Sequence, residues 1–256
     1  MLSGLAGALL IGLSLGLLGS GGSILTVPVL HYLFGQPEQA AIGGSLLVVG
    51  VIAAVAAVPH ALARQVAWPD VAWFGLSGMA GAWFGATLAQ WIPGNVQLGG
   101  FALAMAVAGW RMLAAQPPAP ATSAPAGRRR GAIVAGGTAV GLASGIVGVG
   151  GGFLIVPALV LLARVPMNRA VGTSLAIITL NSLVGFARYL GVLQNRGIEL
   201  DWGTLALVTA LGVAGSLLGH RLATRTPQAL LRKIFGSTLL LLATAIGLDV
   251  ARRVLA

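Results

Sequence analysis

Two glycine-rich stretches are places where the backbone itself could bind a ligand. One runs from Gly19 to Pro28 and the other from Gly148 to Pro157, each within a strongly apolar segment. Glycine lets a backbone approach a ligand closely, and successive N–H groups can hold an anion. A helix that begins after such a break adds the free N–H groups of its first turn and the positive end of its dipole. The predicted chemistry is therefore the binding of a small anion.

The candidate binding residues form two groups. The breaks contribute Gly19, Ser20, Gly21, Gly22, Ser23, Gly148, Val149, Gly150, Gly151 and Gly152. Polar residues in the apolar runs that follow contribute Ser45, Thr173, Ser174, Asn181 and Arg188. Each has a structural alternative: close packing for the glycines, bonding to a helix carbonyl for the hydroxyls, an interhelical hydrogen bond for Asn181, and snorkelling to the interface for Arg188.

The two stretches belong to an internal repeat. With an offset of 129 residues and no gaps, residues 12–46 align with 141–175, and 16 of 35 positions are identical. Gly81–Ala89 also resembles Gly215–Ala223, and both contain Gly-x-x-x-Gly, a spacing that permits close helix packing. The repeat predicts two homologous halves, residues 1–113 and 131–256, joined by a Pro-, Ala- and Arg-rich cytoplasmic linker at 114–130.

Composition places the protein in a membrane. Of 256 residues, 57% are hydrophobic and only 8% are charged, whereas soluble domains carry about 25% charge. The net charge of +10 comes from arginines scattered between apolar runs, as in membrane loops, which argues against nucleic acid. There is no cysteine, so disulfides and thiolate metal sites are excluded. We expect a multi-pass membrane protein.

The apolar runs predict an all-α polytopic membrane fold. Each half begins with a broken element, at 3–34 and 131–163, made of two pieces too short to cross roughly 30 Å of hydrocarbon alone. Full spans follow at 39–62, 70–92, 95–113, 170–190, 202–223 and 234–250.

The broken element could cross the membrane once or turn back as a re-entrant hairpin. If it crosses, the halves are parallel and the Lys and Arg residues divide 9 to 6 between the two sides. If it turns back, the halves are inverted and the division is 11 to 4. Because cytoplasmic loops are enriched in Lys and Arg, we favour inverted repeats, a plan in which binding sites form at broken helices near the midplane.

The duplicated Gly-x-Gly-Gly break with its following proline, the segment Asn168–Leu175 and the Gly-x-x-x-Gly-x-x-Leu-Ala element together resemble the TauE/SafE family of sulfite exporter-like membrane transporters. The resemblance covers nearly the whole chain. It implies a bacterial inner-membrane permease for small sulfur-containing anions such as sulfite, sulfoacetate or other organosulfonates.

Other function classes fit less well. The five acidic residues lie at or near the ends of apolar runs, so the spans hold neither a carboxylate cage for Na⁺ nor the His/Asp/Glu constellation of an enzyme. An anion channel, or a transporter of a non-sulfur organic anion, remains the alternative.

His31, His60 and His220 are candidates for proton coupling or for placement at the interface. The expected partners are a small anion and the lipid bilayer; a homodimer is compatible with the sequence, and no cofactor, metal or nucleic acid is expected.

Overall fold

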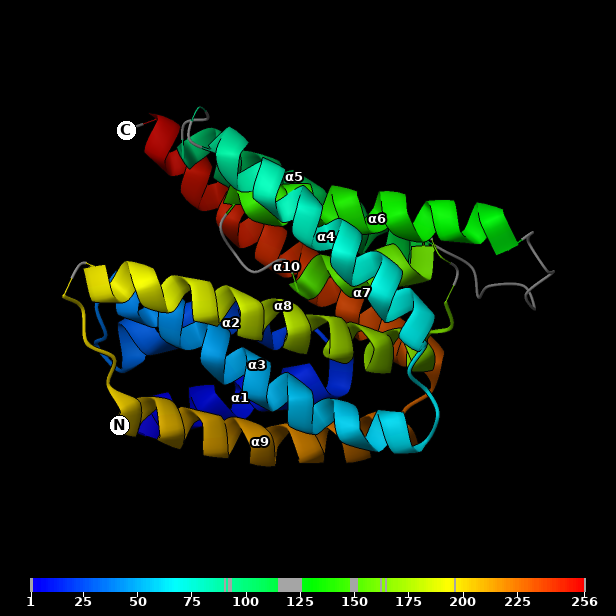
Figure 1. Ribbon diagram of the computed structural model, residues 1–256, viewed down its shortest axis with the longest axis horizontal. Helices are drawn as coiled ribbons and strands as arrows, with labels where there is room; N and C mark the ends of the chain where they lie inside the picture. Colours follow the sequence, from blue (N-terminus) through cyan, green and yellow to red (C-terminus); the bar gives the residue numbers. More distant parts are fainter. Residues whose placement is uncertain are drawn as a thin grey trace. The chain divides into compact units, whose positions relative to one another are not determined.

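The computed structural model describes residues 2–89, 91, 94–114, 126–147, 152–161, 163, 165–195 and 197–255, and all regular structure within these ranges is helical. The predicted all-α fold is thereby confirmed. In chain order the helices are α1 (Leu2–Leu18), α2 (Gly22–Pro28), the π-helix η1 (Val29–Leu33), α3 (Glu38–Leu62), α4 (Trp68–Ala89), α5 (Gly94–Ala114), α6 (Ala126–Val147), α7 (Gly152–Leu161), α8 (Met167–Asn195), α9 (Trp202–Arg225) and α10 (Gln228–Leu255) (Figure 1).

Several helices have the length and composition of membrane spans. Among the described residues, four stretches are long and apolar enough to cross a bilayer: Ala40–Leu62, Met167–Ala187, Trp202–Arg225 and Ala229–Leu248. The pieces on either side of the first glycine break are shorter, with 17 residues in α1 and 7 in α2. All six tryptophans are exposed, five on helices and Trp91 in the turn after α4, as residues of an aromatic belt would be.

The helices divide into two compact units that do not coincide with the two sequence halves. Unit 1 consists of Met1–Val71 and Asn168–Thr226, and unit 2 consists of Ala72–Met167 and Pro227–Ala256. Each unit therefore combines helices from both halves. The division into homologous halves at 114–130 concerns sequence similarity and stays a prediction, and most of that linker lies outside the described residues.

In unit 1, the first broken element folds back on itself. A Cβ on Gly4 would lie 2.8 Å from the ring of Phe34, and one on Gly7 would lie 3.1 Å from Val29. Nearer the break, a Cβ on Gly22 would overlap the carbonyl oxygen of Ile11. Because these contacts pair successively earlier residues of α1 with successively later residues of α2 and η1, the two arms form an antiparallel hairpin.

The second arm of this hairpin widens where proline interrupts its hydrogen bonding. Pro28 ends α2 and has no N–H to donate, and the next five residues, Val29–Leu33, continue as a π-helix. The arm then closes with Gly35 at φ 67° and Pro37 at the N-cap of α3. This route brings the chain into the long apolar helix α3.

The hairpin is held in unit 1 by a contact between α1 and α9 that only glycine permits. A Cβ on Gly12 would overlap the carbonyl oxygen of Gly212, and one on Gly215 would overlap that of Leu9. A Cβ on Gly16 would likewise overlap the carbonyl of Ser216. The two helices thus touch backbone to backbone along several turns, side by side in Figure 1.

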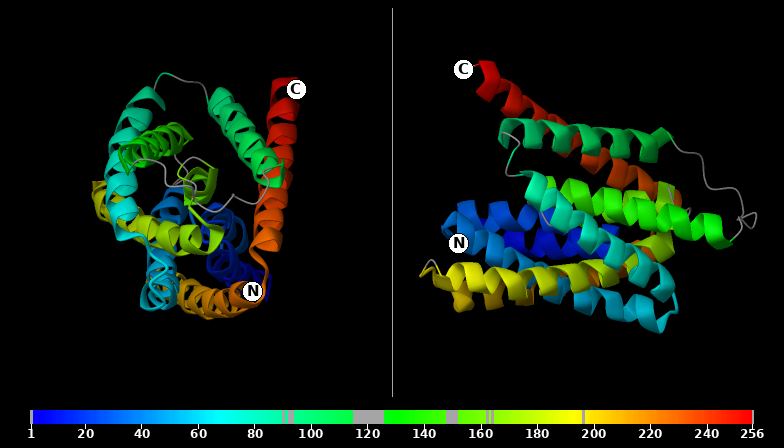
Figure 2. Two further views of the ribbon diagram at one scale, coloured as in Figure 1. Left: turned by 90° about the vertical axis from the view of Figure 1, so that its right-hand side faces the viewer. Right: turned by 45° about the horizontal axis from the view of Figure 1, so that its top comes forward.

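Unit 2 contains an equivalent contact, made by α4 and α6. A Cβ on Gly141 would overlap the carbonyl oxygen of Gly78, and one on Gly81 would overlap that of Thr138. In the repeat alignments, Gly141 corresponds to Gly12 and Gly81 to Gly215. Unit 2 also pairs α5 with α10, which approach closely at Gly109 and Gly236; Figure 2 shows these two helices next to each other.

Candidate functional site

The first glycine break is a sharp turn that requires glycine at its first position. Gly19 has a φ of 77°, a left-handed conformation that a Cβ disfavours. Its N–H donates to the Leu15 carbonyl at 2.8 Å and so closes α1. A Cβ here would also lie 2.8 Å from Ser174 Oγ and 2.9 Å from Val171 Cα, so the turn is packed tightly against α8.

Consecutive residues of α8 fix the turn and its surroundings. Ser174 Oγ lies 2.9 Å from the Gly19 carbonyl oxygen and 2.8 Å from that of Val171, so its single hydrogen is shared between two acceptors. Thr173 Oγ1 accepts a hydrogen bond from the Ala67 N–H at 3.1 Å. Thr173 and Ser174 are fully buried. The structure therefore joins the break of the first half to one predicted site residue of the second half, Ser174, whereas Thr173 binds the backbone at Ala67.

Ser20 is the polar side chain of this turn that has no partner among the described residues. Its side chain is 0% exposed, and Oγ makes no hydrogen bond to this part of the chain. Ser23, three residues later, donates its hydroxyl hydrogen to the Ser20 carbonyl at 3.0 Å. Buried hydroxyls nearly always find a hydrogen-bond partner, and leaving one unpaired costs about 1–3 kcal/mol. The turn thus presents an uncompensated hydroxyl beside the first turn of α2, the part of a helix whose N–H groups have no intrahelical partner.

Gly21 and Gly22 differ in their surroundings. Gly22 is buried against Ile11 and Leu15 of α1, so it allows the hairpin arms to approach. A Cβ on Gly21 would meet nothing closer than Leu18 Cδ1 at 3.5 Å, which is ordinary van der Waals contact. Gly21 is therefore the glycine of this break for which packing gives no explanation.

The remaining predicted residues are not brought to this turn by any described contact. Ser45 Oγ donates to the Ile42 carbonyl at 2.7 Å within its own helix, the structural alternative for a helical hydroxyl. Asn181 lies in α8 with a buried Oδ1 that has no partner. Arg188 lies in the same helix, but its side chain is outside the described part. Gly148, Val149, Gly150 and Gly151 also fall outside it, and Gly152 begins α7.

Several polar residues of unit 1 escaped the sequence analysis. Gln36 is 5% exposed, and within the described part of the chain neither its amide nitrogen nor its amide oxygen has a hydrogen-bond partner. Asn168 also has a buried, unpartnered Oδ1. His60 and His220 are candidates for proton coupling by sequence, but their direct contact, which joins positions 160 apart, was not predicted. No local pattern distinguishes these amides or this pair from other polar residues at helix ends.

Electrostatically, three acidic residues lie at the starts of described helices. Glu38 and Asp70 lie in first turns, and Asp201 caps α9. The side-chain hydroxyl of Thr204 and then its backbone N–H donate to the Asp201 carboxylate and lower its pKa. Among the described residues, no three His, Cys, Asp or Glu side chains are grouped so that they could hold a metal ion.

Comparisons with known proteins identify the family. The family model described as "Sulfite exporter TauE/SafE" matches residues 4–246. A "Probable membrane transporter protein" of Xylella fastidiosa strain 9a5c is 36% identical over 242 residues, covering 93% of this chain and 90% of that protein. A protein of the same description from Methanocaldococcus jannaschii is 27% identical over 249 residues, covering 90% of this chain and 91% of its own. No solved structure matches the chain.

The family match spans both glycine breaks, three of the four membrane-length stretches, and the fourth up to residue 246. It confirms the resemblance found in the duplicated motifs, together with a multi-pass membrane protein that transports and is not an enzyme. The chain belongs to the sulfite exporter TauE/SafE family of membrane transporters.

Proposed function

We propose that this protein is a secondary transporter of a small sulfur-containing anion, such as sulfite, sulfoacetate or another organosulfonate, in a bacterial inner membrane. The anion binds at the turn Gly19–Ser23, where its oxygens accept hydrogen bonds from backbone N–H groups and from Ser20 Oγ. The description of the matching family, a sulfite exporter, supports the substrate class.

The observation that carries the proposal is the buried, unpartnered hydroxyl of Ser20. A bound oxyanion would accept its hydrogen and thereby remove the cost of leaving it unpaired. Acidic groups, which would repel an anion, lie at helix ends. Ser174 contributes by positioning: its bond to the Gly19 carbonyl fixes the turn and directs that oxygen away from the anion.

The second break, Gly148–Gly152, supplies the matching half of the site by the same chemistry, with Thr173, Ser174 and Ser45 beginning the spans that follow each break. In this arrangement the anion lies near the midplane between two broken helices that enter from opposite faces. The antiparallel contacts of α1 with α2 and η1 support a hairpin that enters and leaves on one face. Asn181 and Arg188 are assigned to the pathway leading to the site.

Replacing Ser20 tests the binding turn. In proteoliposomes, Ser20→Ala should slow sulfite uptake about tenfold or more, since hydrogen bonds to charged groups contribute about 1.5–3 kcal/mol. The variant should melt at the same or a higher temperature than the wild type, because it removes an unpaired buried hydroxyl. Thr209→Ala is the matched control: Thr209 lies in α9 and donates its hydroxyl hydrogen to the Leu205 carbonyl within that helix, so uptake should be unchanged. Equal uptake by wild type and Ser20→Ala would remove Ser20 from the site.

The glycines provide a second test. Gly21→Leu and Gly151→Leu should abolish uptake while the protein still folds, because a large side chain would occupy the space of the anion. Normal transport by both variants would exclude the breaks as the binding site. Single-channel current through the wild type would favour the alternative, an anion channel. Uptake of carboxylates in place of sulfur oxyanions would favour a transporter of non-sulfur organic anions.

The topology is tested separately by labelling an N-terminal tag from either face of intact cells. Inverted repeats with re-entrant breaks place both termini outside and the linker 114–130 in the cytoplasm. A cytoplasmic N-terminus would contradict this arrangement.

A further inference from the structure

Two histidines join α3 to α9 in unit 1. His60 lies in the last turn of α3 and is 4% exposed, and His220 lies near the end of α9. His220 Nδ1 is 3.2 Å from His60 Nε2, and the rings meet edge to face with their centroids 4.6 Å apart. The other nitrogen of His60, Nδ1, is 3.0 Å from Gln65 Oε1. The three side chains thus form one hydrogen-bonded row.

The row determines where the hydrogens lie when both rings are neutral. An amide oxygen only accepts, so His60 Nδ1 carries a hydrogen and donates it to Gln65. Nε2 of the neutral His60 is then bare and accepts from the Nδ1–H of His220. One basic nitrogen remains without a hydrogen, Nε2 of His220.

We propose that His60 and His220 form a binding site for a single proton, which enters at Nε2 of His220. A proton there turns the contact into a charge-assisted hydrogen bond from an imidazolium to a neutral imidazole, about twice as strong as the neutral bond. A second proton would place two positive rings in contact and displace the hydrogen bond, so the pair takes up one proton and resists the next.

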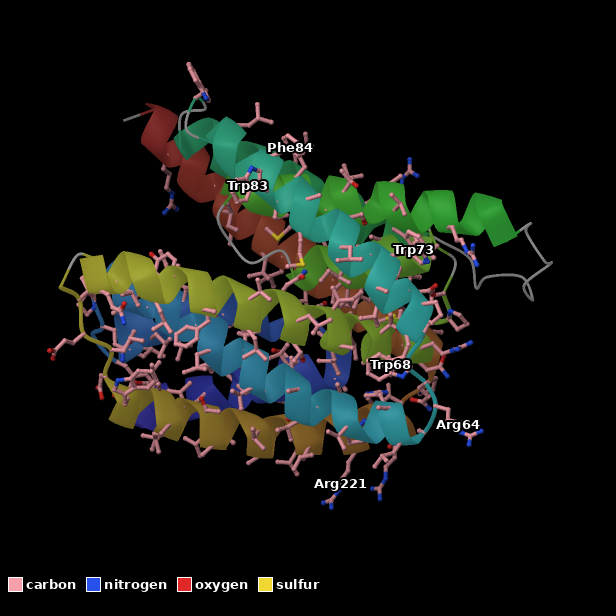
Figure 3. The ribbon with its side chains drawn as sticks, viewed as in Figure 1. Arg64, Trp68, Trp73, Trp83, Phe84 and Arg221 are labelled. Carbon is pink, nitrogen blue, oxygen red and sulfur yellow. The ribbon has the colours of Figure 1, made fainter. Side chains whose placement is uncertain are left out.

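No charged side chain on the surrounding described elements is placed to replace this proton at Nε2 of His220. On the elements packed around the pair, Arg64 follows α3, Arg221 and Arg225 lie on α9, and Arg169 lies on α8; all four are exposed. Figure 3 shows the Arg64 and Arg221 side chains extending away from the helices. Asp70, in the first turn of α4, is buried and has an interaction of its own. α1, which packs along α9, carries no charged side chain.

The pair is connected to the Gly19 turn through three consecutive residues of α8. A Cβ on Gly172 would lie 2.7 Å from His60 Cβ, so this position touches the pair directly. Thr173 binds the Ala67 N–H, just beyond Gln65, and Ser174 binds the Gly19 carbonyl. We assign the pair the role of coupling proton binding to anion movement, an assignment that rests on the proposed function. A change in the hydrogen bond between His60 of α3 and His220 of α9 is transmitted along α8 to the Gly19 turn.

The proton site can be tested without any substrate, because the chain has only three histidines. In ¹⁵N-histidine NMR of the purified protein between about pH 5 and 9, His60 should show a hydrogenated Nδ1 and a bare Nε2 at high pH. On acidification, His220 should become doubly protonated while His60 stays neutral. His60→Phe, which keeps a ring against Gly172, should shift the pH at the midpoint of the His220 titration by about half a pH unit or more. His31→Gln is the control and should leave it unchanged.

Coupling is tested in proteoliposomes with sulfite and with methanesulfonate, whose charge does not change with pH. A pH gradient should alter wild-type net uptake several-fold. His60→Phe and His220→Gln should lose this response while retaining at least half of the wild-type anion exchange at equal pH, a process that needs no net proton movement.

The outcomes separate the two proposals. If His60 and His220 titrate independently, and the titration midpoint of each stays the same when the other is replaced, the proton site is wrong even if sulfite is transported. If both variants keep the full gradient response, the coupling role is wrong. If the NMR result is as expected but no sulfur anion exchanges in the wild type, the proton site stands and the proposed function fails.

Discussion

The contact of α1 with α9 in unit 1 and the contact of α4 with α6 in unit 2 are the same packing built twice. Gly12 meets Gly212 in one, and Gly141 meets Gly78 in the other. The polar residues differ. The repeat offsets of 129 and 134 residues place Tyr189 at the position of His60 and Ala86 at that of His220, so the repeat does not duplicate the histidine pair. Duplication has preserved the close backbone packing, whereas the hydrogen-bonding chemistry has diverged.

The largest effect is expected from filling the shared glycine contact. Gly12→Ala and Gly141→Ala should each destabilise the protein by about 3 kcal/mol, because each methyl would overlap a carbonyl oxygen of the facing backbone. Gly75→Ala is the control in α4, where a Cβ meets nothing within 4 Å. Thermal melting of the purified proteins in detergent measures all three. Strongly unequal losses at Gly12 and Gly141 would show that the two contacts are not equivalent.

Removing the bond that fixes the glycine turn should come next. Ser174→Ala should cost about 2 kcal/mol, since it leaves the buried Gly19 carbonyl unpaired, and should slow transport about tenfold. The repeat-equivalent Ser45→Ala removes only a bond within its own helix and should cost less than about 0.5 kcal/mol. Melting temperature and sulfite uptake distinguish them, and equal effects would assign no special role to the Ser174–Gly19 bond.

A smaller loss is expected at Thr173. Thr173→Val leaves the Ala67 N–H without an acceptor and should cost about 1 kcal/mol, while Thr173→Ser keeps the hydroxyl and should restore most of the stability. The comparison is made by thermal melting. If serine is no better than valine, the hydroxyl contributes nothing and the methyl group decides the packing.

The smallest effect is expected at the N-cap of α9. Asp201→Ala should lower the melting temperature by about 2 °C by removing the acceptor for Thr204. The hydrogen bonds from Thr204 hold the pKa of Asp201 in the folded protein below its usual value, so this stabilisation is present at neutral pH and is lost as the pH falls through the folded pKa. The wild type and the variant should therefore converge in melting temperature under strongly acidic conditions. A difference that persists there would contradict the ionised cap.

The local features of the fold could be predicted from the sequence because they depend on neighbouring residues. Apolar runs predicted the helices, and the glycine clusters predicted the half-length pieces. The exchange of helices between halves could not be predicted, since α1 could pack against the equivalent helix of either half by the same small-residue pattern. The Ser174–Gly19 and His220–His60 contacts join positions 155 and 160 apart, and sequence periodicity carries no information about such pairs.

The exchange of helices also sets the order in which the protein can be completed during synthesis. Residues 1–71 of unit 1 leave the ribosome long before residues 168–226, with which they pack. At about 5–20 residues per second, the wait is roughly 8–30 s. Throughout that time the face of α1 that carries Gly12 and Gly16 has no α9 to pack against. This face is therefore a surface for insertion factors or for premature pairing with another nascent chain.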